Sequence, residues 1–143
     1  MLRMSKLADY AFILLSQMSA HEDRMWSAAA LALETHLPLP TVAKLMKLLA
    51  KSGIVTAQRG ATGGYHLARE AKTISIVQII EAVDGPIGLT ECAGMAMGKK
   101  VCDCAVPICP VRESWGRINT AIRGALEAVY LDELAARPLA SAT

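Results

Sequence analysis

The cysteines of this chain, the residues best suited to bind a metal, all lie in one short segment that also contains glycine and proline. The segment reads ECAGMAMGKKVCDCAVPICP, and its thiols belong to Cys92, Cys102, Cys104 and Cys109. The packing of a core does not require such clustering. Because thiolates are strong ligands for zinc and for iron–sulfur clusters, the segment predicts a metal site or a redox site.

The spacing of the thiols helps to choose between these metals. Zinc fingers usually arrange their cysteines in C-x2-C pairs, and this segment, C-x9-C-x-C-x4-C, contains none. Irregular spacing suits an iron–sulfur cluster, whose irons take thiolates that arrive from several directions. We therefore expect an iron–sulfur cluster, and zinc is the alternative.

The expected compartment agrees with metal chemistry. Asp9 and Tyr10 interrupt the apolar part of the N-terminal region, so no secretory signal is predicted there. No apolar run is long enough to span a membrane. We expect a cytoplasmic protein, and in a reducing cytoplasm clustered cysteines favour metal or redox chemistry over structural disulfides.

One predicted helix, which begins at Pro40 and ends at Gly53, has two different faces. Its apolar residues recur at helical spacing and must face a core; they are Val42, Leu45, Met46 and Leu49. The opposite face carries Thr41, Lys44, Lys47 and Lys51. Since the net charge of the chain is only +2, nucleic-acid binding would depend on a local basic face of this kind.

The elements around this helix indicate what the basic face binds. Helices are predicted over residues 5–19 and 27–36 before it, and a glycine-rich hairpin over 54–68 follows it. A further helix is expected over 75–85. This order is typical of a winged helix-turn-helix, in which the helix after the turn enters the major groove of DNA.

Each basic residue then has an expected role in DNA binding. The lysines of the 40–53 helix are placed to contact phosphates, and Pro40 and Thr41 lie at its start, where base edges are read. Arg59 lies at the tip of the hairpin, or wing. A solvated basic face is the alternative for the helix alone.

A last helix is predicted from about residue 111 to 134, and its apolar positions alternate in steps of three and four. These positions are Trp115, Ile118, Ile122, Ala125 and Val129. Such a seam cannot be buried by one helix that extends beyond a compact domain. We therefore expect a homodimer that pairs these helices.

The expected fold class is mainly α with a small β-hairpin. The predicted organisation is a winged helix-turn-helix domain over 1–85, a cysteine-rich cluster-binding loop over 86–110, a dimerisation helix over 111–136 and a tail over 137–143. No nucleophile–base pair or cofactor fingerprint is present, so an enzyme is not expected.

Several motifs carry a resemblance to a known family. They are MSKLADYAF, LPLPTVAKLMKLLAKSGIV, RGATGGYHLA, ISIVQIIEAVDGPIGLTEC and CPVRESWGRIN, which together cover nearly the whole chain. The chain resembles the iron–sulfur-cluster-binding winged-helix transcription regulators of the IscR and NsrR type. Within that family it is most similar to regulators of the SUF iron–sulfur assembly operon.

The resemblance implies a set of cluster ligands. Cys92 and Cys109 match the two outer cysteines of the family, whose clusters are [2Fe–2S] or [4Fe–4S]. The middle cysteine corresponds to Cys102 or Cys104, because the usual single residue is replaced by CDC. The family's ligand histidine is replaced by Arg112, which cannot bind iron. The fourth ligand is therefore Asp9 of the partner subunit or the extra cysteine.

The resemblance also implies the function. We expect a homodimeric repressor of iron–sulfur assembly genes that binds a pseudo-palindromic operator and senses through its cluster. A nitric-oxide or redox sensor on the same scaffold is one alternative. A zinc-stabilised interaction module that does not bind DNA is the other.

Overall fold

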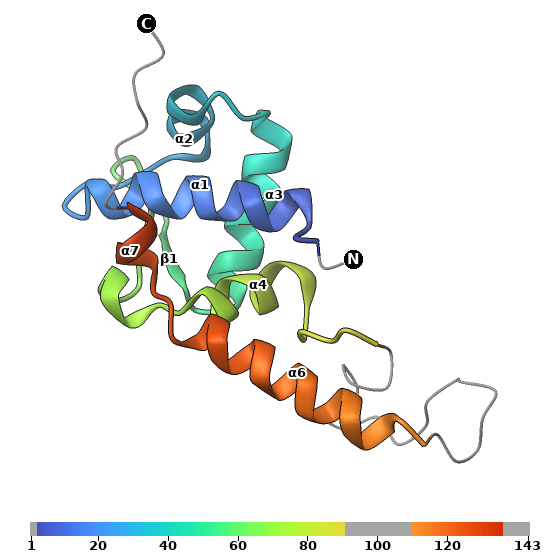
Figure 1. The fold of residues 1–143 in the computed structure, drawn as a ribbon. Helices are drawn as coiled ribbons and strands as arrows, with labels where there is room; N and C mark the ends of the chain where they lie inside the picture. Colours follow the sequence, from blue (N-terminus) through green and yellow to red (C-terminus); the bar gives the residue numbers. More distant parts are fainter. Residues whose placement is uncertain (1–2, 91–109, 136–143) are drawn as a thin grey trace, which may run out of the picture.

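The computed structural model describes residues 3–90 and 110–135, and the remaining residues, including all four cysteines, lie outside this part (Figure 1). The N-terminal helices are α1 (Lys6–Ala20), α2 (Ala28–Thr35) and α3 (Leu39–Lys51). The hairpin strands β1 (Val55–Gln58) and β2 (Gly64–Leu67) follow, and then a short 3-10 helix, η1 (Ala71–Thr73). The C-terminal part contains α4 (Ile76–Asp84), α6 (Arg112–Glu127) and α7 (Leu131–Ala135).

The first two helices begin where their capping residues predict. The Ser5 hydroxyl accepts a hydrogen bond from the Ala8 amide at 3.0 Å, and the Ser27 hydroxyl accepts one from the Ala30 amide at 3.0 Å. Each bond satisfies an amide in the first turn of a helix, which has no partner within the helix itself. The helices α1 and α2 of the predicted winged domain are thereby confirmed.

A short turn joins α2 to α3 and sets the angle between them. His36 ends α2 in the left-handed conformation (φ 57°, ψ 25°), and Pro38 precedes α3. Pro40 occupies the first turn of α3, where its missing N–H removes no helical hydrogen bond. The four predicted apolar residues of α3 are fully buried, so its core-facing side is confirmed.

The hairpin is antiparallel, with Val55 opposite Leu67 and Gln58 opposite Gly64. Near its turn, the strand β2 is tied to the α1–α2 connection, because Trp26 and Tyr65 exchange two backbone hydrogen bonds of 2.8 and 2.7 Å. A Cβ atom on Gly64 would lie 2.6 Å from the Trp26 carbonyl oxygen. Only glycine fits at this position, because any Cβ atom would clash with Trp26 and because the φ of Gly64 is +151°.

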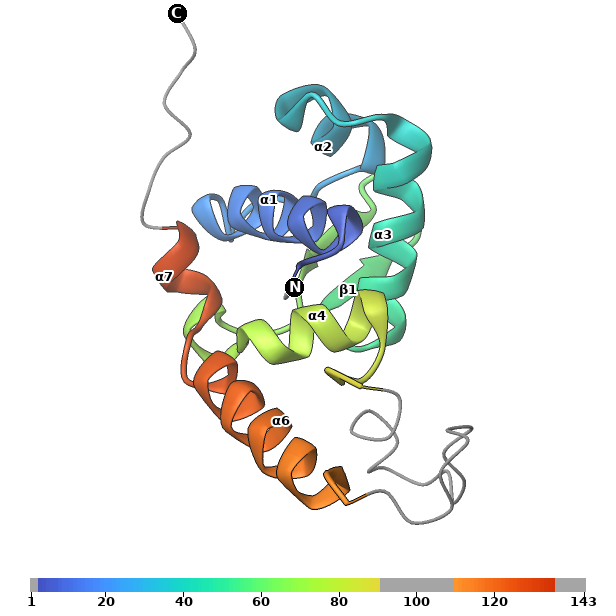
Figure 2. The same cartoon turned by 45° about the vertical axis from the view of Figure 1, so that its right-hand side comes forward.

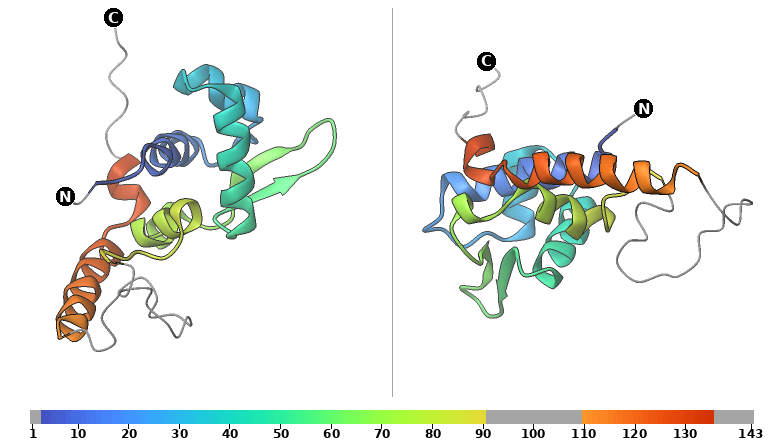
Figure 3. Two further views of the ribbon diagram at one scale, coloured as in Figure 1. Left: turned by 90° about the vertical axis from the view of Figure 1, so that its right-hand side faces the viewer. Right: turned by 60° about the horizontal axis from the view of Figure 1, so that its bottom comes forward.

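The helix α4 closes the core below α1 and α3. Ser75 caps it and forms a capping box with Gln78, and Ile76, Ile79 and Ile80 are buried. The left view of Figure 3 shows α4 beside α6, with the hairpin projecting from the opposite side of the domain.

The prediction of one helix over residues 111–136 is wrong. The chain forms two helices here, α6 and α7, and α6 ends at Glu127. In Figure 1 α6 extends beyond the other helices, whereas α7 turns back against α1. Leu131, the first residue of α7, is fully buried in the common core.

Backbone pairing causes the break between these two helices. The Ile76 amide donates to the Val129 carbonyl at 2.9 Å, and the Leu131 amide donates to the Ile74 carbonyl at 2.9 Å. Residues 128–131 contain neither proline nor glycine, so local propensity favours a continuous helix and tertiary pairing overrides it. Val129 therefore follows α6 instead of lying on it, and it packs against the core.

The predicted fold class, mainly α with a small hairpin, is confirmed. None of the described helices combines the length and the apolar character that a membrane span requires.

Candidate nucleic-acid interface

The outer face of α3 carries a row of cations. At about 100° per residue, Pro40, Lys44, Lys47 and Lys51 fall within about 60° of one another, opposite the buried face. All four residues are exposed. Figure 2 shows α3 at the edge of the molecule. Its three exposed lysines, Lys44, Lys47 and Lys51, are called the lysine stripe, and they lie on the side of α3 opposite the core.

These lysines are not neutralised by neighbouring carboxylates. In the part of the chain that the structure describes, no ion pair involves Lys44, Lys47 or Lys51. Unpaired lysines on one rigid helix create a local positive potential despite the small net charge. The stripe therefore suits a polyanion that follows the helix.

Thr41 lies at the edge of this stripe. Its side chain is half-buried, whereas Pro40 is exposed and in line with the lysines. The structure therefore brings the predicted residues of α3 together, and it gives Pro40 the more accessible position.

The wing provides a second basic contact beside α3. Arg59 directly follows β1, in the turn of the hairpin, and its side chain is exposed. The turn closes tightly, because a Cβ atom on Gly63 would lie 2.2 Å from the Gln58 carbonyl oxygen. Figure 3 (left) shows that the hairpin and α3 lie side by side and that the turn projects beyond the helix.

A cluster in the α1–α2 connection holds the part of this wing that lies next to its turn. The Arg24 guanidinium lies 3.9 Å from the centroid of the Trp26 ring and forms a 3.0 Å ion pair with Glu34 of α2. Trp26 in turn bonds to Tyr65 of β2. The wing is thus connected through Trp26 to both helices that precede α3.

The predicted cluster ligands are only partly placed. Cys92, Cys102, Cys104 and Cys109 lie outside the described residues, and within residues 3–90 and 110–135 no three His, Cys, Asp or Glu side chains gather as a metal site. Asp9 is exposed in the first turn of α1, and it pairs with no cation of the described residues.

The segment that leads to Cys92 is fixed at its beginning. Asn119 of α6 accepts a hydrogen bond from the Leu89 amide at 3.2 Å and donates one to the Ile87 carbonyl at 3.0 Å. The start of α1 is also joined to this region, because the Ser5 hydroxyl donates to Asp84 at 2.8 Å. The helix of Asp9 therefore begins beside the chain that enters the cysteine segment.

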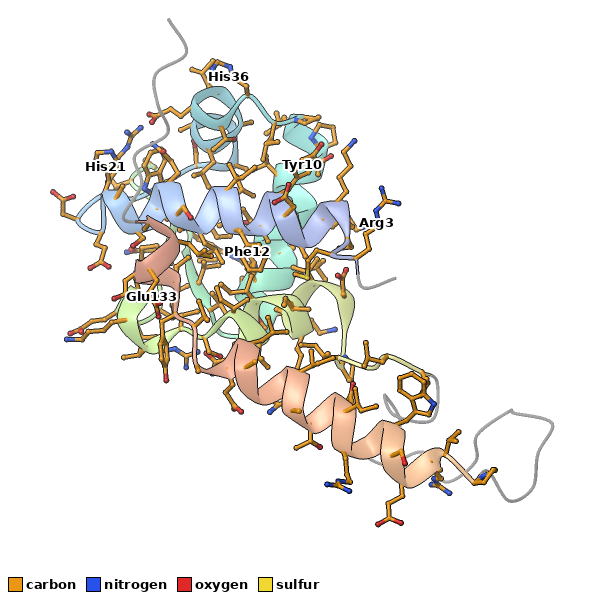
Figure 4. All side chains as sticks on the ribbon, in the orientation of Figure 1. Arg3, Tyr10, Phe12, His21, His36 and Glu133 are labelled. Carbon is orange, nitrogen blue, oxygen red and sulfur yellow. The ribbon has the colours of Figure 1, made fainter. Side chains whose placement is uncertain are left out.

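A cavity of about 430 Å³ lies where α1, α4, α6 and this segment meet. Its walls are mainly apolar and include Met4, Ile80, Ile87, Ile122 and Leu126. In Figure 4, Arg3 and His21 mark the two ends of α1, and the cavity lies at the end marked by Arg3.

The residues of the predicted dimer seam face in different directions. Ile118, which is 44% exposed, and Ala125 face solvent, whereas Trp115 and Ile122 are half-buried. Ile122 shares the walls of the cavity with Ile80 of α4. The outward face of α6 is therefore narrower than the predicted seam.

Asn119 was missed by the sequence interpretation. It is 8% exposed, and it stands between Ile118 and Ile122 on a helix where asparagine has low propensity. An asparagine beside an apolar stripe is a signal that could have been recognised, because a buried amide requires hydrogen-bond partners.

Comparison with known proteins assigns this architecture to regulators. A family model described as "Rrf2: Iron-dependent Transcriptional regulator" matches residues 4–137. The HTH-type transcriptional regulator IscR of Photobacterium profundum is 28% identical over 135 residues, which cover 93% of this chain and 75% of that protein. A putative HTH-type transcriptional regulator of Haemophilus influenzae is 32% identical over 108 residues, or 76% and 69% of the two chains.

A solved structure shows the same fold. CymR (YrzC), the global cysteine regulator of B. subtilis, superposes with a TM-score of 0.69 at 28% identity, over 95% of this chain and 98% of that chain. The comparison supports the predicted winged-helix fold class.

Proposed function

The chain belongs to the Rrf2 family of iron-dependent transcriptional regulators, and from this membership we propose that it is a homodimeric repressor of iron–sulfur assembly genes. The resemblance to the IscR type is thereby confirmed, and the protein is a DNA-binding regulator and not an enzyme. The observation that carries the proposal is the unpaired lysine stripe of α3 beside the wing.

The DNA contacts follow from the positions of these elements. With α3 in the major groove, Lys44, Lys47 and Lys51 neutralise phosphates, and Arg59 reaches the backbone or the neighbouring minor groove. Because phosphate contacts carry no sequence information, these cations position the protein and contribute affinity.

A homodimer is proposed because α6 presents Ile118 and Ala125 to solvent outside the compact domain. Two copies joined through this face would carry two α3 helices related by a two-fold axis. Such an arrangement binds a pseudo-palindromic operator whose half-sites are about one helical turn apart, or a multiple of it.

The donor set fits an iron–sulfur cluster. Cys92, Cys109 and one or both of Cys102 and Cys104 would supply thiolates, and the exposed carboxylate of Asp9 can complete the shell. When bound, such a cluster would bridge the segments that carry its ligands, and its loss on iron limitation or oxidation would separate them. With Asp9 as a ligand, the cluster would also be connected to the helix α1.

Two other sensing functions share this scaffold. CymR is a global cysteine regulator, so cysteine regulation is one of them. A nitric-oxide or redox sensor is the other. The clustered thiols favour a cluster-dependent sensor over a zinc-stabilised interaction module. Anaerobic purification separates these two: visible absorption with bound iron supports the cluster, and a colourless protein with stoichiometric zinc contradicts it.

The DNA-binding part of the proposal is tested by salt dependence. Lys44→Ala and Lys47→Ala should each weaken binding to every duplex and reduce the slope of log K against log salt by about one unit. Lys72→Ala is the control, because Lys72 is exposed on η1 and paired with Glu70 at 2.7 Å. An unchanged slope in both α3 variants would exclude α3 from the interface.

A further inference from the structure

The recognition helix α3 lacks every side chain that reads a base by two hydrogen bonds except lysine. Its sequence, LPTVAKLMKLLAK, contains no Arg, Asn, Gln, Asp or Glu. The usual partners of guanine and adenine in the major groove are Arg or Lys and Asn or Gln, respectively. The only such side chain on α3 is therefore lysine, a partner of guanine, so any reading of adenine–thymine pairs by this helix depends on other contacts.

The first turn of α3 is instead apolar and accessible. Leu39 is 48% exposed, Pro40 is exposed, and the half-buried Ala43 lies between them around the helix circumference. Thr41 adds the one hydroxyl group of this turn, and its side chain is half-buried. These residues occupy the end of the helix that a helix-turn-helix directs at base edges.

The exposure of Leu39 is not explained by the fold. Neighbouring Leu37 packs against the core, whereas Leu39 leaves nearly half of its surface in solvent. The helix does not require it for capping, since α3 starts from Pro38 without a side-chain cap. Because Leu39 lies at the end of the helix that a helix-turn-helix directs at base edges, its exposed surface is available to an apolar group of the DNA.

The chemistry of the surrounding surface identifies that partner. The lysine stripe begins one turn away, at Lys44, so whatever contacts Leu39 is part of a polyanion. In the major groove of DNA the only apolar group is the C5-methyl of thymine. Resting on the proposed binding of DNA through α3, we infer that Leu39, Pro40 and Ala43 read thymine methyl groups in each half-site of the operator.

The inference is tested with DNA that lacks those methyl groups. The probe is a duplex selected by the full-length protein from a random-sequence library. Each thymine of the selected half-sites is replaced by deoxyuridine, which keeps the base pair and removes only the methyl group. We expect affinity to fall about fourfold for each methyl group that is contacted, at equivalent positions of both half-sites.

Two variants assign the effect to α3. Leu39→Ala should lower affinity for the thymine duplex and leave little difference between the thymine and uracil duplexes at the position it contacts. Leu33→Ala, on α2, is the matched control, because Leu33 is 76% exposed. It should bind both duplexes as the unmodified protein does.

The outcomes separate this inference from the proposed function. Equal affinity for thymine and uracil at every position would overturn the inference, even where the salt dependence through Lys44 and Lys47 persists. A thymine preference that survives unchanged in Leu39→Ala would overturn the assignment to the first turn of α3. If Lys44→Ala and Lys47→Ala instead leave the salt slope unchanged, the proposed binding of DNA through α3 is contradicted.

Discussion

Cys92 and Cys109 are the residues on which the sensing proposal depends most. Thiolates bind iron far better than neutral thiols, so the loss of an essential cysteine should abolish the cluster instead of tuning it. Cys92→Ala and Cys109→Ala should each give colourless protein after anaerobic reconstitution, measured by visible absorption and iron content. Full occupancy in either variant would refute the ligand assignment.

The pair Cys102 and Cys104 provides its own matched control, because only a necessary ligand should abolish the cluster when it is replaced by alanine. If both are necessary, four thiolates complete the shell and Asp9→Ala should leave the spectrum unchanged. If only one is necessary, Asp9→Ala should shift the spectrum or make the cluster labile.

The sequence predicted the positions of those residues whose placement depends on local spacing. The lysines of α3 follow from helical spacing, and the structure places them on one exposed face as predicted. Leu39 was not recognised because its importance comes from its exposure, and Asn119 was overlooked although an asparagine beside an apolar stripe signals a buried amide. A sequence does not show the exposure of a single residue.

At the scale of elements, Asn119 joins α6 to the chain that enters the cysteine segment. Asn119→Ala removes both side-chain hydrogen bonds and leaves the Leu89 amide and the Ile87 carbonyl without this partner. We expect the free energy of unfolding to fall by about 1–3 kcal/mol, as measured by urea denaturation.

A neighbouring variant tests whether this loss is specific. Thr120→Ala removes a hydroxyl that bonds within α6, to the Gly116 carbonyl, and it should change stability by less than about 1 kcal/mol. Equal stability of the Asn119 and Thr120 variants would contradict a tether at this position.

Elements whose ends are marked by capping residues were predicted from the sequence, and elements shaped by distant contacts were not. Ser5, Ser27 and Gly53 mark helix ends that the structure confirms. The break after α6 carries no such mark, because it results from pairing of Tyr130 with Ser75. Local patterns cannot show a backbone pairing between residues so far apart in the sequence.

At the scale of the whole molecule, one side of α6 packs within the subunit and another side faces solvent. One side of it packs on α4, where Arg123 forms an ion pair with Glu81 at 3.2 Å. The hydrogen bond from Arg123 to that carboxylate is the main cause that raises the pKa of Arg123. The other side presents Ile118 to solvent. A dimer built on this second side would connect α4, and through it the DNA-binding domain, to the partner subunit.

The dimer is best tested at Ile118, because Ile122 also lines the cavity beside α4 and its substitution would disturb the packing within one subunit. Ile118→Lys places a charge from each subunit in a paired apolar face, and an uncompensated buried charge is strongly destabilising. Sedimentation should show monomers with an unchanged helical content. Leu33→Lys makes the same type of change at a more exposed leucine of α2, and it should leave the dimer intact.

Because two half-sites are bound with high affinity only by a joined pair of domains, the Ile118 variant should also lose tight operator binding while each domain keeps its salt-dependent affinity. A normal dimer in this variant would show that the outward face of α6 is not the interface.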